Sequence, residues 1–418
     1  MVELLIRAQR YDTGQPVEVY LQNGYIQAVR AAAESVQDRA LVPTHKISAA
    51  EIRVLEAEYL APGFCDIQVN GALGHNFTSS GLTVEAVRAV SNECLRHGTT
   101  RFCPTVITSD TQTLRQALRV LAQAVAEDPL LQEMIPGIHL EGPYISPEPG
   151  PRGAHPAEQV RPPNREEFRQ LQESAQGLIR VVTLAPNWPE APDFIAWLSN
   201  QGVLVALGHH NARPEQISAA VRAGARLCTH LGNGCDLFLP RHPNYLWEQL
   251  AQDALWASLI CDGHHLPASV IKCFLRCKTP HRCVLISDAS PLAGLSPGRY
   301  CLWGKTVTLH RDGRTEVVDE RGQSLLAGAA AFLDTGVFRA WRDGDIALAP
   351  AVQLATCQPR QLLGLSASDF LQPGRRADLV LFDVAEDRLQ VRYTLLGEHL
   401  ISREAKSQPR TQELGPCG

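Results

Sequence analysis

The sequence contains no uninterrupted apolar run near the ~18 residues of a membrane span, although 44% of its 418 residues are hydrophobic. Its first residues, MVELLIRAQRYD, lack the charged start and apolar core of a secretion signal. Lys and Arg number 39 against 44 Asp and Glu, and this net charge of −5 offers no basic surface for nucleic acid or anionic membrane. These absences predict a cytoplasmic protein that binds neither nucleic acid nor membrane.

The sequence also lacks a Cys-x-x-Cys pair, although it contains 12 cysteines. This absence argues against a structural zinc site or a redox dithiol. Five of the cysteines fall within apolar runs, at Cys65, Cys103, Cys228, Cys261 and Cys283. A free cysteine behaves as a small buried hydrophobe, so we expect buried, reduced thiols at these positions.

No glycine-rich phosphate turn follows the first predicted strand of the middle region, which argues against a doubly wound open sheet. Residues 59–373 instead repeat a unit of helical periodicity, a short apolar strand and polar residues. The eight strand candidates are 63–68, 100–106, 135–140, 180–184, 203–207, 225–229, 257–261 and 282–287. Eight such units over about 300 residues predict a (β/α)8 barrel of the TIM type.

The two ends of the chain differ from the middle because polar and apolar residues alternate there. The stretches VELLIRAQRY and PVEVYLQNGYIQAV lie near the amino terminus, with Asn23-Gly24 as a hairpin turn. The stretches ADLVLFDV (377–384) and LQVRYTLLGEHL (389–400) lie near the carboxyl end. We therefore predict that residues 1–58 and 374–418 form one small β-sandwich domain beside the catalytic barrel of residues 59–373.

Polar side chains follow most of the predicted barrel strands. In chain order they are Gln68, Asn70, Glu141, His209, His210, His230, Asn233, Asp262, His264, His265 and Asp288. A closed barrel brings the carboxyl ends of its strands to one face, where catalytic residues gather. Five of the 14 histidines in the chain belong to this set. One carboxylate and two imidazoles, with a fourth position left for water, is how proteins hold catalytic zinc.

Seven segments carry a family resemblance. They are APGFCDIQVNG (61–71), GIHLEGPYI (137–145), LGHHNA (207–212), THLGNG (229–234), CDGHHL (261–266), ISDAS (286–290) and LAGAA (326–330). In order and spacing, the chain resembles the N-acetylglucosamine-6-phosphate deacetylases of the amidohydrolase superfamily along nearly its whole length. The resemblance implies a metal-dependent hydrolase that converts N-acetylglucosamine 6-phosphate to glucosamine 6-phosphate and acetate in amino-sugar metabolism.

The resemblance also assigns the reacting groups. By position, Glu141, His209 and His230 become the ligands of one divalent ion, expected to be Zn, with Fe, Co or Mn as alternatives. Asp288 takes the place of the catalytic aspartate, which can accept a proton from water and deliver it to the leaving amine. His155, in RGAH (152–155), matches the histidine that polarises the substrate carbonyl.

Four further positions match the substrate contacts of the family. Asn233 and Gly234 match positions whose backbone meets the phosphate, and Arg241 and His265 match the remaining phosphate and sugar contacts. The resemblance implies a homodimer in which Arg241 reaches the site of the neighbouring subunit. Its expected partner is a small amino-sugar phosphate.

The chain departs from related enzymes at two places. Many amidohydrolases carry His-x-His after the first strand, whereas this chain has Gln68 and Asn70. Neutral amides are poor ligands, so we predict a single metal ion with these two residues hydrogen-bonded around it. The glycines of THLGNG stand where relatives often carry larger residues, so the pocket is expected to be more open.

Other activities are consistent with the same residues. They are deacetylation of another amino-sugar phosphate such as the galactosamine epimer, hydrolysis of a cyclic amide, and silent binding of a sugar phosphate. A cyclic amidase would normally need His-x-His and a bridging lysine. A silent protein has no need to retain metal ligands. Asp66, His75, His97 and His139 are expected to be structural or on the surface, Asp262 to orient a loop, and His210 not to bind the metal.

Overall fold

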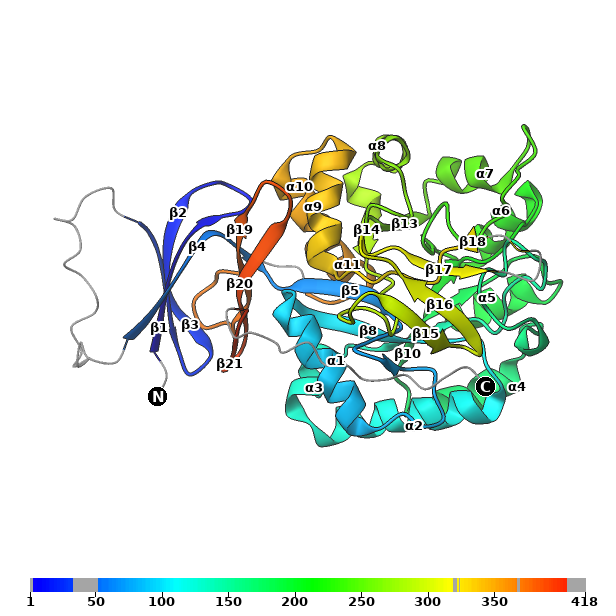
Figure 1. Ribbon diagram of the computed structural model, residues 1–418, viewed down its shortest axis with the longest axis horizontal. Coiled ribbons are helices and arrows are strands. Elements are labelled where there is room, and N and C mark those ends of the chain that lie inside the picture. Colours follow the sequence, from blue (N-terminus) through cyan, green and yellow to red (C-terminus); the bar gives the residue numbers. More distant parts are fainter. Residues whose placement is uncertain (1–2, 33–51, 319–321, 323, 367–368, 404–418) are drawn as a thin grey trace.

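The computed structural model describes residues 3–32, 52–318, 322, 324–366 and 369–403. Two β structures lie side by side in it, a parallel barrel and a seven-stranded sheet (Figure 1). Parts of the two terminal segments predicted to form the β domain, residues 33–51 and 404–418, lie outside the described residues.

The barrel contains all eight predicted strands, hydrogen-bonded in chain order and all parallel. They are β5 (Phe64–Val69), β8 (Thr99–Ile107), β9 (Ile138–Glu141), β10 (Ile179–Leu184), β11 (Leu204–Leu207), β12 (Leu227–Cys228), β13 (Trp256–Ile260) and β14 (Cys283–Ile286). The ring closes at its carboxyl rim, where Asp288 N donates to Gln68 O at 3.0 Å and Asn70 N donates to Ala289 O at 2.8 Å. The third strand starts at Ile138 because Ile135 still caps a helix.

Helices surround the barrel and pack their apolar faces against it. They are α1 (Val84–Arg96), α2 (Thr111–Glu127), α3 (Pro129–Met134), α4 (Arg165–Ser174), α5 (Ala191–Ser199), α6 (Pro214–Ala223), α7 (Tyr245–Ala251), α8 (Ala268–Lys278), α9 (Leu333–Gly344), α10 (Leu348–Leu354) and α11 (Cys357–Leu362), with 3-10 turns η2 (Ala157–Gln159) and η3 (Pro280–Arg282). Helix α2 begins where Asp110 accepts from the backbone N–H of Thr113 at 2.9 Å. In the described part of the chain, no helix has the length and apolar character needed to cross a membrane.

Both ends of the chain contribute to the seven-stranded sheet, as the alternating patterns predicted. Its order is β21 (His399–Ser402), β20 (Leu389–Leu396), β19 (Asp378–Val384), β4 (Ile52–Pro62), β1 (Glu3–Arg10), β2 (Pro16–Gln22) and β3 (Tyr25–Ala31). Asn23 and Gly24 form the turn between β2 and β3 with φ of 51° and 75°, the left-handed backbone that this turn requires. Strand β4 leads directly into the barrel, so the sheet is joined to the first barrel strand.

A four-stranded antiparallel sheet between β14 and α9 was not predicted. It contains β15 (Gly298–Leu302), β16 (Lys305–Leu309), β17 (Thr315–Val318) and β18 (Ser324–Leu325); a two-stranded ribbon, β6 (Gly71–Ala72) with β7 (His75–Asn76), follows the first barrel strand. The inserted sheet has a small core of its own, which includes Leu302, Val307 and Val317. Alternating residues and the Trp303-Gly304 turn were its signals in the sequence.

The five cysteines predicted to be buried thiols, Cys65, Cys103, Cys228, Cys261 and Cys283, are free and buried.

Candidate active site

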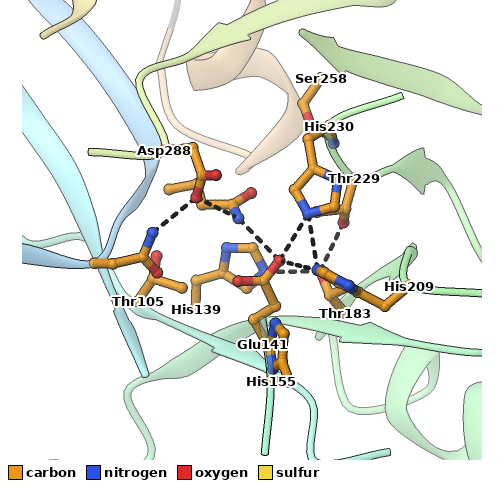
Figure 2. Close-up of polar contacts among 12 residues, drawn as sticks. Thr105, His139, Glu141, His155, Thr183, His209, Thr229, His230, Ser258 and Asp288 are labelled. Carbon is orange, nitrogen blue, oxygen red and sulfur yellow. Dashed lines mark hydrogen bonds and ion pairs between the residues drawn. The ribbon is translucent and has the colours of Figure 1, made fainter. Parts of the chain in front are cut away.

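Three side chains from different barrel strands meet at the carboxyl rim of the barrel (Figure 2). Glu141 ends β9, His209 follows β11 and His230 follows β12. Glu141 Oε1 lies 3.2 Å from His209 Nε2 and 3.0 Å from His230 Nε2, and the two Nε2 atoms are 3.0 Å apart. All three side chains are buried. The barrel thus converges one carboxylate oxygen and two imidazole nitrogens on one point.

This geometry fits a divalent metal ion. Ligands about 2.0–2.1 Å from a tetrahedral ion are separated by ~3.3 Å, close to the 3.0–3.2 Å observed between these three atoms. His209 Nδ1 lies 2.9 Å from Pro151 O, an acceptor that places the ring proton on Nδ1 and leaves a lone pair on Nε2. His155 also has a ring nitrogen within 4.8 Å of the ligating atoms of Glu141 and His209. We favour His230 as the third ligand because its Nε2 is closer to both.

Backbone strain is concentrated at this rim. His209, His230 and Asp288 have φ of 53°, 32° and 50°, in the left-handed region that side-chain-bearing residues seldom adopt. Each lies two residues beyond the end of a barrel strand. Such strain persists only where the surrounding structure enforces it, and it is typical of functional sites.

Asp288 belongs to the same cluster through two amides. Gln68 Nε2 donates to Asp288 Oδ1 and to Glu141 Oε1, each at 3.0 Å, and Asn70 Nδ2 donates to Asp288 Oδ1 at 2.7 Å. Both amides therefore donate to Asp288, and Gln68 also donates to the candidate ligand Glu141. Gln68 uses both of its N–H groups to join Glu141, a candidate ligand, to Asp288, the candidate proton acceptor.

The surroundings of the two carboxyl groups in the cluster shift their pKa values in opposite directions. Burial alone raises the pKa of Glu141, but hydrogen bonds with His209 and His230 lower it well below its ordinary value. Burial, followed by the nearby charge of Glu141, raises the pKa of Asp288 to about 6. One carboxylate is thus held ionised while the other can exchange a proton near neutral pH, the division that acid–base catalysis requires.

His155 lies beside this cluster, its ring edge-on to that of His209 with centroids 4.4 Å apart (Figure 2). Burial, and next the nearby His209, lowers the pKa of His155 to about 3, so its imidazole is neutral. The Thr108 hydroxyl lies 2.8 Å from Nδ1 and can donate to it. In that tautomer Nε2 carries a proton that it can donate to a substrate.

A cavity of about 320 Å³ opens over the cluster. Of the predicted site residues, its walls include Asn70, Glu141, His155, His209, His230, Asn233, Gly234, His265 and Asp288. Gln68 lies behind the wall, bound to two of the lining carboxylates. Arg241 does not line the cavity of its own chain and is exposed on the loop before α7.

The loop after β13 is organised by Asp262. Its carboxylate accepts from the backbone N–H groups of His264 and His265 at 2.8 and 2.9 Å and lies 2.7 Å from His265 Nδ1. These contacts agree with the predicted loop-orienting role of Asp262, and His265 also lines the cavity. His210 packs against Tyr245, with ring centroids 5.4 Å apart, and is absent from the main cavity wall.

Gly234 approaches the candidate ligands closely. A Cβ atom there would lie 2.8 Å from His209 Nδ1 and 3.1 Å from His230 Cε1, and its φ of 56° is also left-handed. Glycine at this position lets the backbone pass directly behind the two imidazoles.

Trp303 is a cavity residue that the sequence analysis missed. It occupies the turn between β15 and β16 with a left-handed φ of 52° and lines the cavity. Its indole Nε1 is buried, with no hydrogen-bond partner in the described part of the chain. A buried N–H group without a partner is costly, so the indole of this cavity-lining residue is a candidate contact for a polar ligand.

The residues expected to be structural make internal contacts. Asp66 accepts from the backbone N–H groups of Gln68 and Ser287 at 3.1 and 3.2 Å, which joins the first and last barrel strands. His139 lies between Ile67 O, 3.0 Å from Nδ1, and Thr183 Oγ1, 2.8 Å from Nε2. Both side chains support the barrel beneath the cluster.

Comparison with known proteins gives a consistent picture. A model of the amidohydrolase family matches residues 59–249. The N-acetylglucosamine-6-phosphate deacetylase of Bos taurus is 34% identical over 360 residues, 84% of this chain and 85% of the relative. The N-acetylgalactosamine-6-phosphate deacetylase of Escherichia coli O157:H7 is 33% identical over 330 residues, 78% of this chain and 84% of the relative.

A similar solved structure carries a sugar phosphate. It is a variant of N-acetyl-D-glucosamine-6-phosphate deacetylase from Mycobacterium smegmatis in complex with N-acetyl-D-glucosamine-6-phosphate. The TM-score is 0.81 at 28% sequence identity, and the match covers 96% of this chain and 99% of that chain.

Proposed function

Because the chain belongs to the N-acetylglucosamine-6-phosphate deacetylases of the amidohydrolase family, we propose that it hydrolyses the acetamide of N-acetylglucosamine 6-phosphate. The products are glucosamine 6-phosphate and acetate. The observation that carries this proposal is the convergence of Glu141, His209 and His230 within 3.2 Å, with Asp288 joined to them through Gln68.

Glu141, His209 and His230 would hold one divalent ion, for which we propose zinc. Such an ion lowers the pKa of a bound water toward ~7 and polarises a carbonyl oxygen. Gln68 and Asn70 offer amides rather than imidazoles and are engaged with Asp288, which supports a single ion. Metal analysis that finds two ions per active chain would contradict this stoichiometry.

Asp288 accepts the proton of the attacking water and passes it to the amine leaving group, which would otherwise be too basic to depart. The amides of Gln68 and Asn70 donate to its carboxylate and hold it in place, and burial raises its pKa to about 6, near neutral pH. The Nε2–H of His155 donates to the carbonyl oxygen of the acetamide as negative charge develops there. A neutral His155 donates without adding a competing positive charge.

We propose that the backbone around Asn233 and Gly234, together with His265, binds the sugar phosphate. All three residues line the cavity. Arg241 is exposed on its own chain, which agrees with the proposal that it completes the site of a second chain in a homodimer. The guanidinium group suits a phosphate dianion because it offers paired N–H donors.

Two further assignments remain proposals of this kind. The protein acts in the cytoplasm, an assignment that fits the amino-sugar phosphate proposed as its substrate. The catalytic barrel spans residues 59–373, with the β domain formed by the residues on either side.

The decisive experiment compares deacetylation of N-acetylglucosamine 6-phosphate, its galactosamine epimer and unphosphorylated N-acetylglucosamine, before and after chelation. We expect turnover of N-acetylglucosamine 6-phosphate above the other two, abolished by the chelator and restored by added zinc. Asp288→Asn, which keeps the shape of the side chain, should retain bound metal but lose activity. Preferred turnover of the epimer would reassign the substrate within the same chemistry. Absence of both metal and turnover would instead indicate a silent sugar-phosphate binder.

A further inference from the structure

A second cavity, of about 350 Å³, lies away from the active site where the barrel meets the seven-stranded sheet. Its walls come from the end of β4, from the amino-terminal end of β8, from α3 and α11, and from the segment that leads into β19. In Figure 1 this region lies between the two β structures. The volume is comparable with the 320 Å³ of the catalytic cavity, so a ligand of similar size has room here.

The charge of this second cavity is unbalanced. Its charged lining residues are Arg101, Arg360, Arg375, Arg376, Glu133 and Asp378. Among the lining residues that the structure describes, four cations and two carboxylates give a formal charge of +2, in a protein whose net charge is −5. A cluster of ion pairs that only held two parts of the chain together would need equal numbers of cations and carboxylates.

The two carboxylates are already engaged by arginines. Asp378 Oδ2 accepts from Arg360 Nη2 at 3.1 Å and lies 3.5 Å from Arg101 Nη2. Glu133 Oε2 lies 3.0 Å from Arg376 Nη2, and its Oε1 accepts from Arg101 Nη2 at 3.4 Å. Arg101 is therefore shared between both acids, and neither carboxylate is reserved for a single cation.

Arg360 gives the cavity a fixed, desolvated cation. It is only 7% exposed, and its Nη1 donates to Thr356 O at 3.1 Å. Its position is therefore set before any ligand arrives. A buried guanidinium that is already held in place binds an anion more strongly than a mobile surface side chain does.

We propose that this cavity binds a small dianion, a phosphate group that is either free or carried by a small metabolite. A dianion matches the surplus charge of +2, and guanidinium groups bind phosphate oxygens in a bidentate manner. Because the walls come from the barrel and from the segment entering β19, the bound anion would join the two parts and raise the stability of the folded chain.

The test is titration of the full-length protein with inorganic phosphate, followed by calorimetry and by thermal unfolding. Arg375→Gln and Arg101→Gln each remove one cavity cation. The matched control is Arg169→Gln, which removes an arginine of 60% side-chain exposure on α4 that also pairs with a carboxylate. The catalytic cavity can also take phosphate, so the comparison between variants isolates the second site.

We expect two phosphates per chain in the wild type and in Arg169→Gln. In both cavity variants one of the two sites should weaken at least ~10-fold, the loss expected when an anion gives up a charged hydrogen bond. The kcat/KM for deacetylation should stay within twofold in Arg375→Gln, whose side chain lies outside the catalytic site. If Arg101→Gln does not fold, Arg375→Gln decides alone.

Equal phosphate affinity and stoichiometry in all four proteins would overturn the proposal, as would a single phosphate per chain in the wild type. A parallel titration with glucose 6-phosphate distinguishes the two sources. Binding at the second site at least ~10-fold tighter than that of inorganic phosphate identifies a carried phosphate, and equal or weaker binding identifies a free one. That result is independent of which amide the catalytic site hydrolyses.

Discussion

Gln68→Glu tests the role of the amide that joins the two carboxylates of the catalytic cluster. The substitution keeps the shape of the side chain but replaces the amide nitrogen, which lies 3.0 Å from both Glu141 Oε1 and Asp288 Oδ1, by an oxygen. At an effective dielectric constant of about 20, two unit charges at that distance repel by ~5.5 kcal/mol. Two such repulsions together approach the whole stability of a typical domain.

The cluster therefore cannot hold three ionised carboxylates without another cation, and we expect the introduced carboxyl group to be protonated at neutral pH. A protonated carboxyl has one O–H donor where the amide has two N–H donors. One of the two existing carboxylates loses its partner, at a cost of ~1.5–3 kcal/mol for a hydrogen bond to a charged group. We expect kcat/KM for deacetylation to fall by roughly 10- to 100-fold.

Steady-state kinetics combined with metal analysis provides the assay. Gln68→Met, which has neither donor, is the matched control and should lose more activity than Gln68→Glu. Wild-type rates in both variants would refute the bridging role of Gln68. A second metal ion in Gln68→Glu with full activity would refute a different part of the reasoning, since it would mean that the third carboxylate had become a ligand.

Three further predictions concern residues around the site and one buried ion pair. Trp303→Phe removes the buried indole N–H of a cavity-lining residue. We expect kcat/KM to fall about 2- to 10-fold, the worth of one hydrogen bond, while the midpoint of thermal unfolding should not fall. An unchanged rate would show that this N–H contacts no substrate. We expect the variants Arg241→Ala and Asp288→Asn to be inactive when each is assayed alone. Activity should return when the two are mixed and refolded together, because a mixed dimer contains one site with both residues intact. If no activity returns, Arg241 acts in the site of its own chain or in no site. His97 lies 2.9 Å from Asp334, and although burial lowers its pKa, the charge of Asp334 raises it above its ordinary value. The stability that protonated His97 contributes is therefore complete below the unfolded pKa of ~6.5 and is lost as the pH rises through the folded pKa. Denaturant titration should find His97→Gln destabilised by ~1–3 kcal/mol at pH 5.5 and by less at pH 9. A loss of stability that does not depend on pH would contradict the ion pair.

Barrel topology explains why much of the site could be predicted from the sequence. Glu141, His209, His230 and Asp288 are far apart along the chain, but each follows a short apolar strand. Parallel strands that are neighbours in one closed sheet end at the same rim. Once eight strands had been recognised, the convergence of these side chains followed without any knowledge of their distances.

The residues that sequence reasoning missed depend on contacts for which no local pattern exists. Trp303 reaches the cavity only because the sheet inserted after β14 packs over the barrel mouth. The side chains that line the second cavity contact residues far away in the sequence. Arg360, for example, contacts Thr100, 260 positions away. Periodicity reports which face of an element is buried, but it does not report which distant element covers that face.

Local propensity also fails at the positions of three side chains proposed to take part in the reaction. His209, His230 and Asp288 occupy left-handed backbone for which glycine or asparagine is the usual choice. A sequence chosen for stability alone would place glycine there and lose the imidazole or the carboxylate. The strained backbone is retained because it directs the side chain from the end of the strand inward over the barrel axis. Conflict between local preference and observed backbone is thus an indication of function, and at this rim it agrees with the roles proposed for these three residues.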